Sequence, residues 1–347
     1  MSANLYVGVS NRTGGDVSGL YRRAVDSDQW TLCGLPPRTH VHAVTVHPDD
    51  PATLDAAASS GLYRTRDRGD TWTRLIESEG REQFWSVLIH PGDHRIILTG
   101  TAPLGLHRSD DGGETFRRMP RPAIGERLVG AFPSRIMRMA VAPSRPNTIW
   151  AGLEVNGAMR SDDGGESWID LSDPLVELSK QPHLGSAILT KDTAEGMLDI
   201  HALCVSPAAP DTPFLALRMG LFRGEDRGGA WSDLNIGQHA AHLRYGRDVV
   251  VAPWDPATLF ACVADSSRGQ AGRLYKSTDI GATWTQIDRG IEVHSTMMAV
   301  AVDASEPGRI HCVARQGQTF STADGGASWR EIPLPEGAGA AVAAACG

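Results

Sequence analysis

The chain has 347 residues, a formal net charge of −8 and a charged fraction of 21%. It carries no basic stripe of the kind that binds nucleic acid, no long apolar run that would span a membrane, and no charged-then-apolar leader. We therefore exclude nucleic-acid and membrane partners and expect a cytoplasmic protein whose acidity serves solubility. The five cysteines include no CxxC pair and are expected to be reduced thiols within strands.

One short phrase recurs along the chain. In order, its copies are "GLYRRAVDSDQW" (19–30), "GLYRTRDRGDTW" (61–72), "GLHRSDDGGETF" (105–116), "GAMRSDDGGESW" (157–168), "GLFRGEDRGGAW" (220–231), "RLYKSTDIGATW" (273–284) and "QTFSTADGGASW" (318–329). The closing aromatic residues lie 42 to 63 residues apart. A repeat of this length is typical of a propeller or solenoid array.

Each repeat predicts four short strands. An alternating Val/Ile run ends at a Pro-containing turn, a second apolar run follows, the phrase supplies the third strand, and the residues after the aromatic supply the fourth. Seven such units predict an all-β, single seven-bladed β-propeller over 1–347. The first repeat lacks its Val-rich strand, so we expect 339–347 to pair with 4–10 and close the ring with strands from both termini.

A carboxylate recurs between the third and fourth predicted strands, in the pattern Ser/Thr-x-Asp-x-Gly-x-Ser/Thr, which we call the Asp turn. The aspartates are Asp67, Asp111, Asp163, Asp226, Asp279 and Asp324. Each is expected to accept hydrogen bonds from its own turn, and the following glycine to take the positive φ of the hairpin. In this pattern the chain resembles the Asp-box (bacterial neuraminidase repeat) superfamily of sialidases, xyloglucan-active glycosidases, sortilin-type receptors and photosystem II assembly factors. There the Asp box is a structural turn, so the resemblance implies architecture more than function.

The two faces of such a ring differ in their loops. The Asp turns share one face and have nearly constant lengths, whereas the links between blades on the other face vary. The longest link, 170–199, has little strand pattern, and we expect it to fold over the mouth of the channel as a lid; disorder is the alternative. Function is expected on this variable face.

Alignment of the innermost strands on their Val-x-Val core places polar residues at the mouth of the channel. The positions two and four residues before the core are His42, Trp85, Met137, His201, Arg247 and Met298, and His40, Gln83, Arg135, Asp199, Tyr245 and Thr296. Nearby loops add Glu154, Asn156, His239, His242, Asp265, Arg268 and His294. The remaining histidines, His47, His90, His94, His107 and His311, are expected to be structural or solvated.

These residue types suggest chemistry on a small polar ligand that is anionic or sugar-like. The candidate catalytic residues are His42, His201, Asp199 and Tyr245, and the candidate substrate-binding residues are Trp85, Gln83, Arg135, Arg247, Glu154 and His294. Histidine can transfer protons near neutral pH, and arginine can hold a carboxylate or phosphate. A divalent metal ion held by His40, His42 and His201 is a further possibility, although blades two and five lie far apart in the ring.

Two classes of function remain open at this point. A sialidase would be expected to carry a Phe/Tyr-Arg-Ile-Pro motif and a Tyr/Glu pair; the nearest match is Ser134-Arg135-Ile136-Met137, so a sialidase is disfavoured. A glycosidase with two carboxylates could use Glu154, Asp199, Glu195 or Asp248. We expect a hydrolase or lyase acting in the channel. The alternative is a non-catalytic binding or assembly scaffold with a protein partner, similar to the photosystem II assembly factors.

Overall fold

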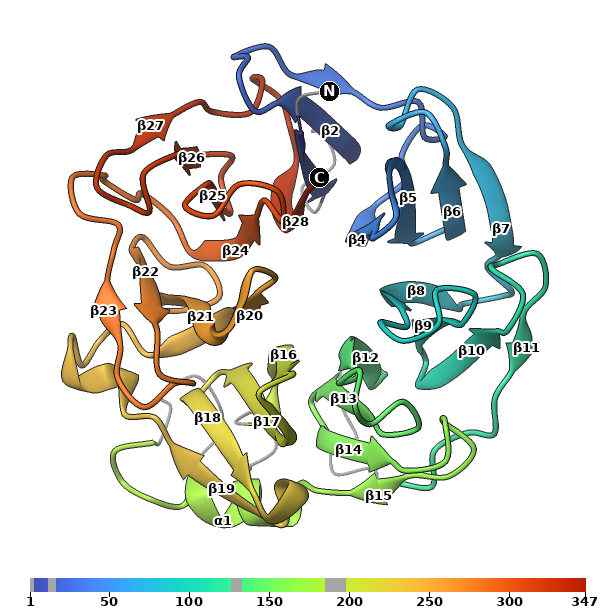
Figure 1. Ribbon diagram of the computed structural model, residues 1–347, viewed down its shortest axis with the longest axis vertical. Helices are drawn as coiled ribbons and strands as arrows, with labels where there is room; N and C mark the ends of the chain where they lie inside the picture. The colour runs from blue at the N-terminus through green and yellow to red at the C-terminus, as the bar shows by residue number, and fades with distance from the viewer. Residues whose placement is uncertain (1–2, 12–16, 126–132, 185–197) are drawn as a thin grey trace.

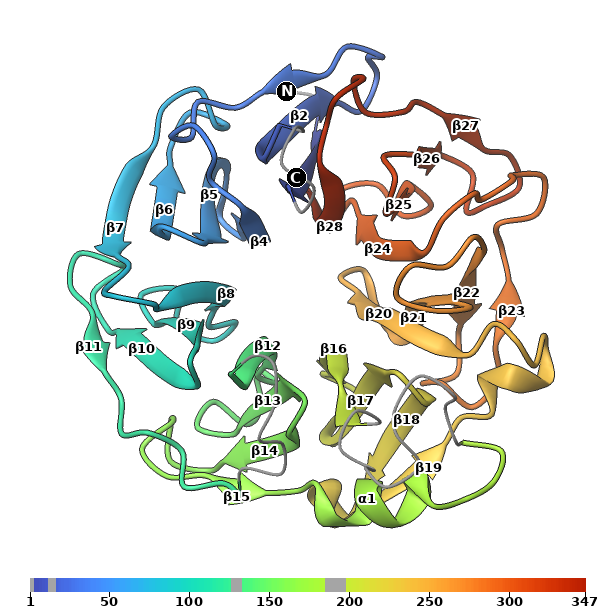
Figure 2. The ribbon, with the colours of Figure 1, turned by 180° about the vertical axis from the view of Figure 1, so that it is seen from behind.

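The computed structural model describes residues 3–11, 17–125, 133–184 and 198–347. Within these residues, seven four-stranded antiparallel sheets are arranged in a ring, as Figures 1 and 2 show from opposite sides. The predicted seven-bladed propeller is confirmed. The α-helix of the described part is α1 (Asp173–Ser179), and short 3-10 turns occupy Asp226–Gly228 and Ile236–Gln238. None of the described helices is long and apolar enough to cross a membrane.

The strands occupy four concentric positions, taken here in blade order from blade 1 to blade 7. The innermost strands are β28 (Ala340–Cys346), β4 (Val41–His47), β8 (Gln83–Ile89), β12 (Arg135–Ala140), β16 (Ile200–Ser206), β20 (Tyr245–Ala252) and β24 (Met297–Val302). The second strands are β1 (Asn4–Ser10), β5 (Asp50–Ala58), β9 (Ile97–Ala102), β13 (Ile149–Glu154), β17 (Ala209–Leu217), β21 (Asp255–Ala264) and β25 (Ile310–Ala314).

The two outer positions complete each blade. The third strands are β2 (Gly19–Ala24), β6 (Gly61–Thr65), β10 (Gly105–Ser109), β14 (Gly157–Ser161), β18 (Gly220–Glu225), β22 (Gly272–Ser277) and β26 (Thr319–Thr322). The outermost strands are β3 (Thr31–Leu32), β7 (Thr73–Glu77), β11 (Arg117–Arg118), β15 (Ile169–Asp170), β19 (Ala230–Asp233), β23 (Thr285–Gln286) and β27 (Arg330–Glu331). Burial is greatest at the second position and least at the outermost one: β1 is buried throughout, β28 is partly buried, and both residues of β3 are exposed.

Both chain ends meet in blade 1. β28 pairs antiparallel with β1, and the backbone N–H of Asn4 donates to the carbonyl of Gly347 at 2.8 Å. Figure 1 shows β28 between β24 and β4, where it fills the innermost position that the first repeat lacks. The ring therefore closes as predicted, and this pairing covers the inner edge of β1.

The Asp turn of blade 4 shows how these turns satisfy their own polar groups. The carboxylate of Asp163 accepts from the hydroxyls of Ser161 (2.7 Å) and Ser167 (2.6 Å) and from the backbone N–H of Ser167 (2.9 Å). The hydroxyl of Ser161 accepts from the N–H of Gly165, whose φ of +100° strongly favours glycine. Equivalent hydrogen bonds surround Asp67, Asp111, Asp279 and Asp324.

The Asp turn of blade 5 departs from the prediction. Asp226 has Gly224 and Ala230 where the other turns have hydroxyl residues, so the two hydroxyl donors to its carboxylate cannot exist. Asp226 instead takes a φ of +47° and begins the 3-10 turn of blade 5. Its predicted role as a turn acceptor of the common kind is therefore wrong.

The aromatic residues that follow the Asp turns lie at the outer edge of the core. Trp231 and Trp284 are buried, at 6% exposure each, whereas Trp168 is half-buried and packs against the cluster that includes Met159. Trp231 also donates its indole N–H to the carbonyl of Leu171 in the preceding blade at 3.1 Å. Where they are buried, these rings tie neighbouring blades together.

Candidate functional site

A ring of β-bulges shapes the mouth of the channel. In each innermost strand the pairing register skips one residue, so that this residue has no partner on the second strand. The seven skipped residues are His42, Trp85, Met137, His201, Arg247, Met298 and Val342. A bulge bends the strand and redirects its side chain, and all seven residues line one cavity of about 240 Å³. We call this cavity the mouth pocket.

Most of the predicted site residues come together in the mouth pocket. Those that line it are His42, Trp85, Arg135, Glu154, Asp199, His201, Tyr245 and Arg247. Three predicted site residues do not line the pocket. Gln83 is the first residue of β8 and lies outside the lining. His40 turns toward blade 1, where its Nδ1 lies 3.0 Å from the hydroxyl of Ser10, and His294 is largely exposed beside Glu292. Substrate-binding roles for Gln83 and His294 therefore lack support from their positions.

Trp85 is covered by two planar groups. The ring of His42 stacks on it at 3.8 Å with an interplanar angle of 6°, and the guanidinium of Arg135 lies 3.8 Å from its ring centre. The ring predicted to bind substrate is therefore engaged in contacts within the protein. The indole N–H of Trp85 is buried and has no hydrogen-bond partner among the described residues. Trp85 thus holds Arg135 in place by a cation–π contact.

Tyr245 and His201 form a buried hydrogen-bonded pair. His201 Nδ1 lies 2.6 Å from the carbonyl of Gly246, so this nitrogen carries the proton and donates it. Nε2 is then the acceptor for the Tyr245 hydroxyl, at 3.0 Å. Burial, with the charge of Arg247, holds the pKa of His201 well below its ordinary value, while burial raises the pKa of Tyr245. The imidazole is therefore neutral and the phenol protonated at neutral pH.

Two carboxylates in the mouth pocket are paired with arginines. Arg135 donates to Glu154 across the β12–β13 pair, and Arg218 donates to Asp199. Asp199 is 4% exposed, and burial raises its pKa despite the charge of Arg218. A carboxyl whose pKa is raised by burial can hold a proton that an exposed aspartate would lose.

The pocket is cationic although the chain is acidic. Among its described lining residues, five arginines face two carboxylates: Arg135, Arg218, Arg247, Arg268 and Arg315 against Glu154 and Asp199. The Nε–H groups of Arg218 and Arg247 are buried without a hydrogen-bond partner among the described residues. The excess of arginine favours an anionic, acceptor-rich ligand in this pocket.

Sequence reasoning missed Arg218 and Arg315 as site residues. Both directly follow a second strand, β17 or β25, in the turn that opens toward the mouth. Ser10 of β1 and Ser267 in the corresponding loop of blade 6 also line the pocket. Alignment of the second strands, in addition to the innermost strands, would have found the two arginines, because their position relative to the strand end is the same.

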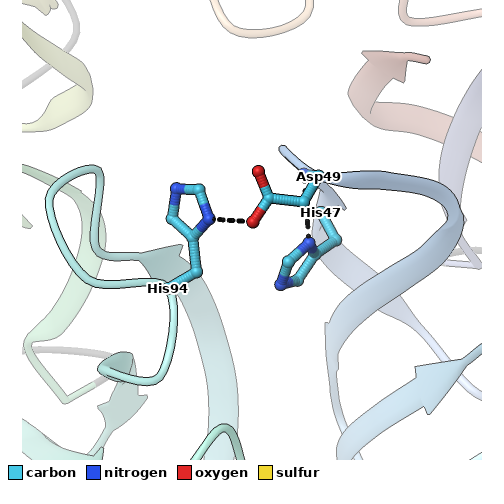
Figure 3. A group of neighbouring side chains, drawn as sticks. All are labelled: His47, Asp49 and His94. Atoms are coloured by element: carbon cyan, nitrogen blue, oxygen red, sulfur yellow. Dashed lines mark hydrogen bonds and ion pairs between the residues drawn. The ribbon is translucent and has the colours of Figure 1, made fainter.

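The predicted three-histidine metal site does not form. His42 is the bulged residue of β4, so the alternation that would place His40 and His42 on one side is broken. His42 Nδ1 lies 2.8 Å from the carbonyl of Phe84, and both ring nitrogens of His201 are engaged. A different group of three side chains could hold a metal ion in the described part of the chain: His47, Asp49 and His94, shown in Figure 3. Their metal-ligating atoms lie within 4.8 Å of one another.

The long link of blade 4 is only partly described. Its helix α1 lies at the outer rim of the ring, in contact with β19 (Figure 1). Residues 185–197, which include Glu195, lie outside the described residues. The lid over the mouth therefore stays a prediction, and α1 itself is not part of it.

No family model matches the chain. In sequence it is similar to a xyloglucanase of a Paenibacillus species, 24% identical over 78% of this chain and 29% of that protein. It is also similar to the xyloglucanase Xgh74A of Acetivibrio thermocellus, 26% identical over 78% of this chain and 36% of that protein. The chain thus spans about a third of the length of these relatives.

Solved structures share the fold. The GH74 enzyme of Niastella koreensis superposes with a TM-score of 0.61 at 18% identity, over 94% of this chain and 46% of that one. YCF48 bound to a D1 peptide superposes with a TM-score of 0.57 at 13% identity, over 95% of this chain and 88% of that one. At such identities the likeness shows the propeller alone.

Proposed function

We propose that this chain is a hydrolase of the glycoside hydrolase type that takes a small anionic, sugar-like ligand in the mouth pocket. The observation that carries the proposal is that the Tyr245–His201 pair and five arginines open into the same cavity. The similarity to xyloglucanases supports cleavage of a sugar. The excess of arginine supports an acidic group on that sugar, because guanidinium groups bind carboxylates and phosphates in a bidentate manner.

The binding roles follow from the charges. Arg247 and Arg218 line the pocket with positively charged guanidinium groups, so we assign them to the acidic group of the ligand. Arg135 donates to Glu154 and holds this carboxylate in the lining of the pocket. His42 contributes through its stack on Trp85 rather than as an acid or base.

The chemical roles follow from the Asp199 carboxyl and the Tyr245–His201 pair. Because burial raises the pKa of Asp199, we assign it as the acid that gives its proton to the leaving oxygen. Neutral His201 accepts the proton of the attacking water through the Tyr245 hydroxyl, which passes one proton to Nε2 as it takes another. One water molecule is consumed, and its proton ends on His201 while the leaving group receives the proton of Asp199.

The test is hydrolysis of a panel of aryl glycosides that differ only in the acidic group, including glucuronides, galacturonides and the matching neutral hexosides, together with xyloglucan oligosaccharides. We expect turnover of an acidic glycoside, and a loss of about 100-fold or more in kcat/KM for Tyr245→Phe and His201→Gln. Arg145→Gln is the matched control, since Arg145 forms an exposed ion pair with Asp211 away from the pocket. Turnover of the neutral hexosides alone, or no turnover at all, contradicts the proposal.

A second candidate function is a binding scaffold for an acidic peptide segment. It is favoured by the near full-length match to YCF48, a protein solved with a bound peptide, whereas the GH74 enzyme is matched over less than half its length. Under this alternative the arginines would bind peptide carboxylates, and the Tyr245–His201 pair would be structural. Binding of acidic peptides that Arg247→Gln abolishes, with no turnover of any glycoside, would favour the scaffold.

A further inference from the structure

A second cluster of histidine and carboxylate lies on the Asp-turn face, at the end of the strands opposite the mouth pocket. His47 ends β4 and Asp49 lies in the turn that follows, whereas His94 comes from the corresponding turn of blade 3. Figure 3 shows the three side chains between these two turns. His94 Nδ1 lies 2.5 Å from a carboxylate oxygen of Asp49, and the rings of His47 and His94 are 5.5 Å apart at 81°.

Both turns are held in shape before any ligand binds. In blade 2 the backbone N–H of Asp49 donates to His47 Nδ1 at 3.2 Å. In blade 3 the equivalent His90 accepts from the N–H groups of Gly92 and Asp93 at 3.1 Å each, and its Nε2 contacts the carbonyl of Pro146. His94 is thus presented by a turn that a buried histidine anchors, which lowers the cost of ordering it as a ligand.

The lone pairs of the cluster suit a metal ion. Because His47 Nδ1 accepts a hydrogen bond, it is unprotonated, and an ion can bind its electron pair if this 3.2 Å contact to the Asp49 N–H opens. His94 Nδ1 shares one proton with Asp49, and a cation can take the place of that proton. The ligating atoms of all three residues lie within 4.8 Å of one another, so small side-chain rotations bring them to one ion.

We propose that His47, Asp49 and His94 bind a divalent transition-metal ion, with Zn²⁺, Ni²⁺ and Cu²⁺ as the chemical class. Two imidazoles and one carboxylate are the donors these ions prefer, whereas Mg²⁺ and Ca²⁺ require oxygen ligands. Three protein ligands leave a coordination position for water. The ion would link blade 2 to blade 3. The site lies on the face opposite the mouth pocket and does not depend on the function proposed there.

The experiment is calorimetric titration of the full chain, without a polyhistidine tag, with Zn²⁺ and Ni²⁺. We expect one ion per chain and no heat with Mg²⁺. His47→Gln, Asp49→Asn and His94→Gln should each weaken binding by about 10-fold or more. His183→Gln is the matched control, because His183 forms a surface pair with Asp233 at 3.4 Å with no third ligand among the residues that the structure describes, and it should leave binding unchanged.

A spectroscopic measurement separates ligation from an indirect effect on folding. Electron paramagnetic resonance of one equivalent of Cu²⁺ should show hyperfine coupling to two imidazole nitrogens, and each histidine substitution should remove one of them. All three side chains are half-buried or exposed, so the variants should unfold at the temperature of the wild type. Binding that the three substitutions leave intact, or that His183→Gln weakens equally, overturns the proposal.

Discussion

The two faces of the ring place aspartates in opposite electrostatic situations. On the Asp-turn face, hydrogen bonds from Ser167 and Ser161 lower the pKa of Asp163 to about 2, and solvent lies close by. At the mouth, burial raises the pKa of Asp199 although Arg218 is bound to it. The first carboxylate is satisfied by its own turn and has nothing to offer a ligand. The second retains a proton equilibrium that chemistry can use, so the pKa shift separates architecture from a candidate site.

The largest expected loss of stability is at an aromatic residue that follows an Asp turn and joins two blades. Trp231 is buried and donates to Leu171 of the preceding blade, so Trp231→Ala should lower the free energy of unfolding by about 3–5 kcal/mol. Ile169→Ala, at a site 47% exposed, should change it by less than about 0.5 kcal/mol. Denaturant titration of both variants measures this. Equal stability of the two would contradict the view that these aromatics join the blades.

At the mouth, the expected effect is on activity. Asp199→Asn keeps the shape of the side chain and an acceptor for Arg218 but removes the titratable proton. Hydrolysis of the best acidic glycoside should fall by about 100-fold or more, while the unfolding temperature changes little. Steady-state kinetics and calorimetry of the same preparation give both numbers. A large loss of stability with unchanged activity would make Asp199 a structural residue like Asp163.

The fold could be predicted from the sequence because its signals are local and repeated. Seven copies of one phrase set the blade count, and the Ala-rich strand at 339–347 filled the one gap. The mouth residues could be placed because each lies a fixed number of residues before an apolar pair such as Val44 and Val46. Roles could not be assigned in the same way. The bulge at His42 removed it from the side of His40, and the pairing of Tyr245 with His201 joins two blades.

Contacts between blades explain the remaining misses. His47 and His94 were expected to be structural or solvated, yet Asp49 brings them together across two turns that no spacing rule connects. Arg218 and Arg315 reach the mouth from second strands, which the alignment did not cover. Asp226, in contrast, could have been recognised as different, since Gly224 and Ala230 are visible in the sequence as missing hydroxyls.

The missing hydroxyl residues of the Asp226 turn give the third prediction. Asp163→Ala leaves the N–H of Ser167 and two hydroxyls without their acceptor and should cost about 1–2 kcal/mol, at the lower end because the turn is exposed. Asp226→Ala removes none of these hydrogen bonds and should cost about half of that or less. Thermal unfolding of the two variants decides it. A larger cost for Asp226→Ala would show that its turn depends on the carboxylate in a way the geometry does not reveal.

The smallest expected effect concerns a histidine inside a blade, which belongs to neither face. His311 is 1% exposed, and its Nδ1 lies 2.7 Å from the hydroxyl of Ser321, which also accepts from Arg23. Burial, with the charge of Arg23, lowers the pKa of His311 to about 3.

The low pKa of His311 makes the stability of the fold depend on pH. The unfolded chain binds a proton below about pH 6.5 that the folded chain does not bind until about pH 3. The free energy of unfolding therefore falls as the pH falls from about 6.5 to about 3. His311 contributes about 1.4 kcal/mol per pH unit to that slope, whereas buried Asp199, whose pKa is raised, contributes with the opposite sign. Urea titration at pH 6 and pH 5 gives the slope of the unfolding free energy against pH for wild type and for His311→Gln. The two slopes are compared, because a hydrogen bond lost in the variant changes the free energy by the same amount at both pH values and leaves the slope unchanged. Parallel curves would show that His311 is protonated in the folded state and that its surroundings are more polar than this packing implies.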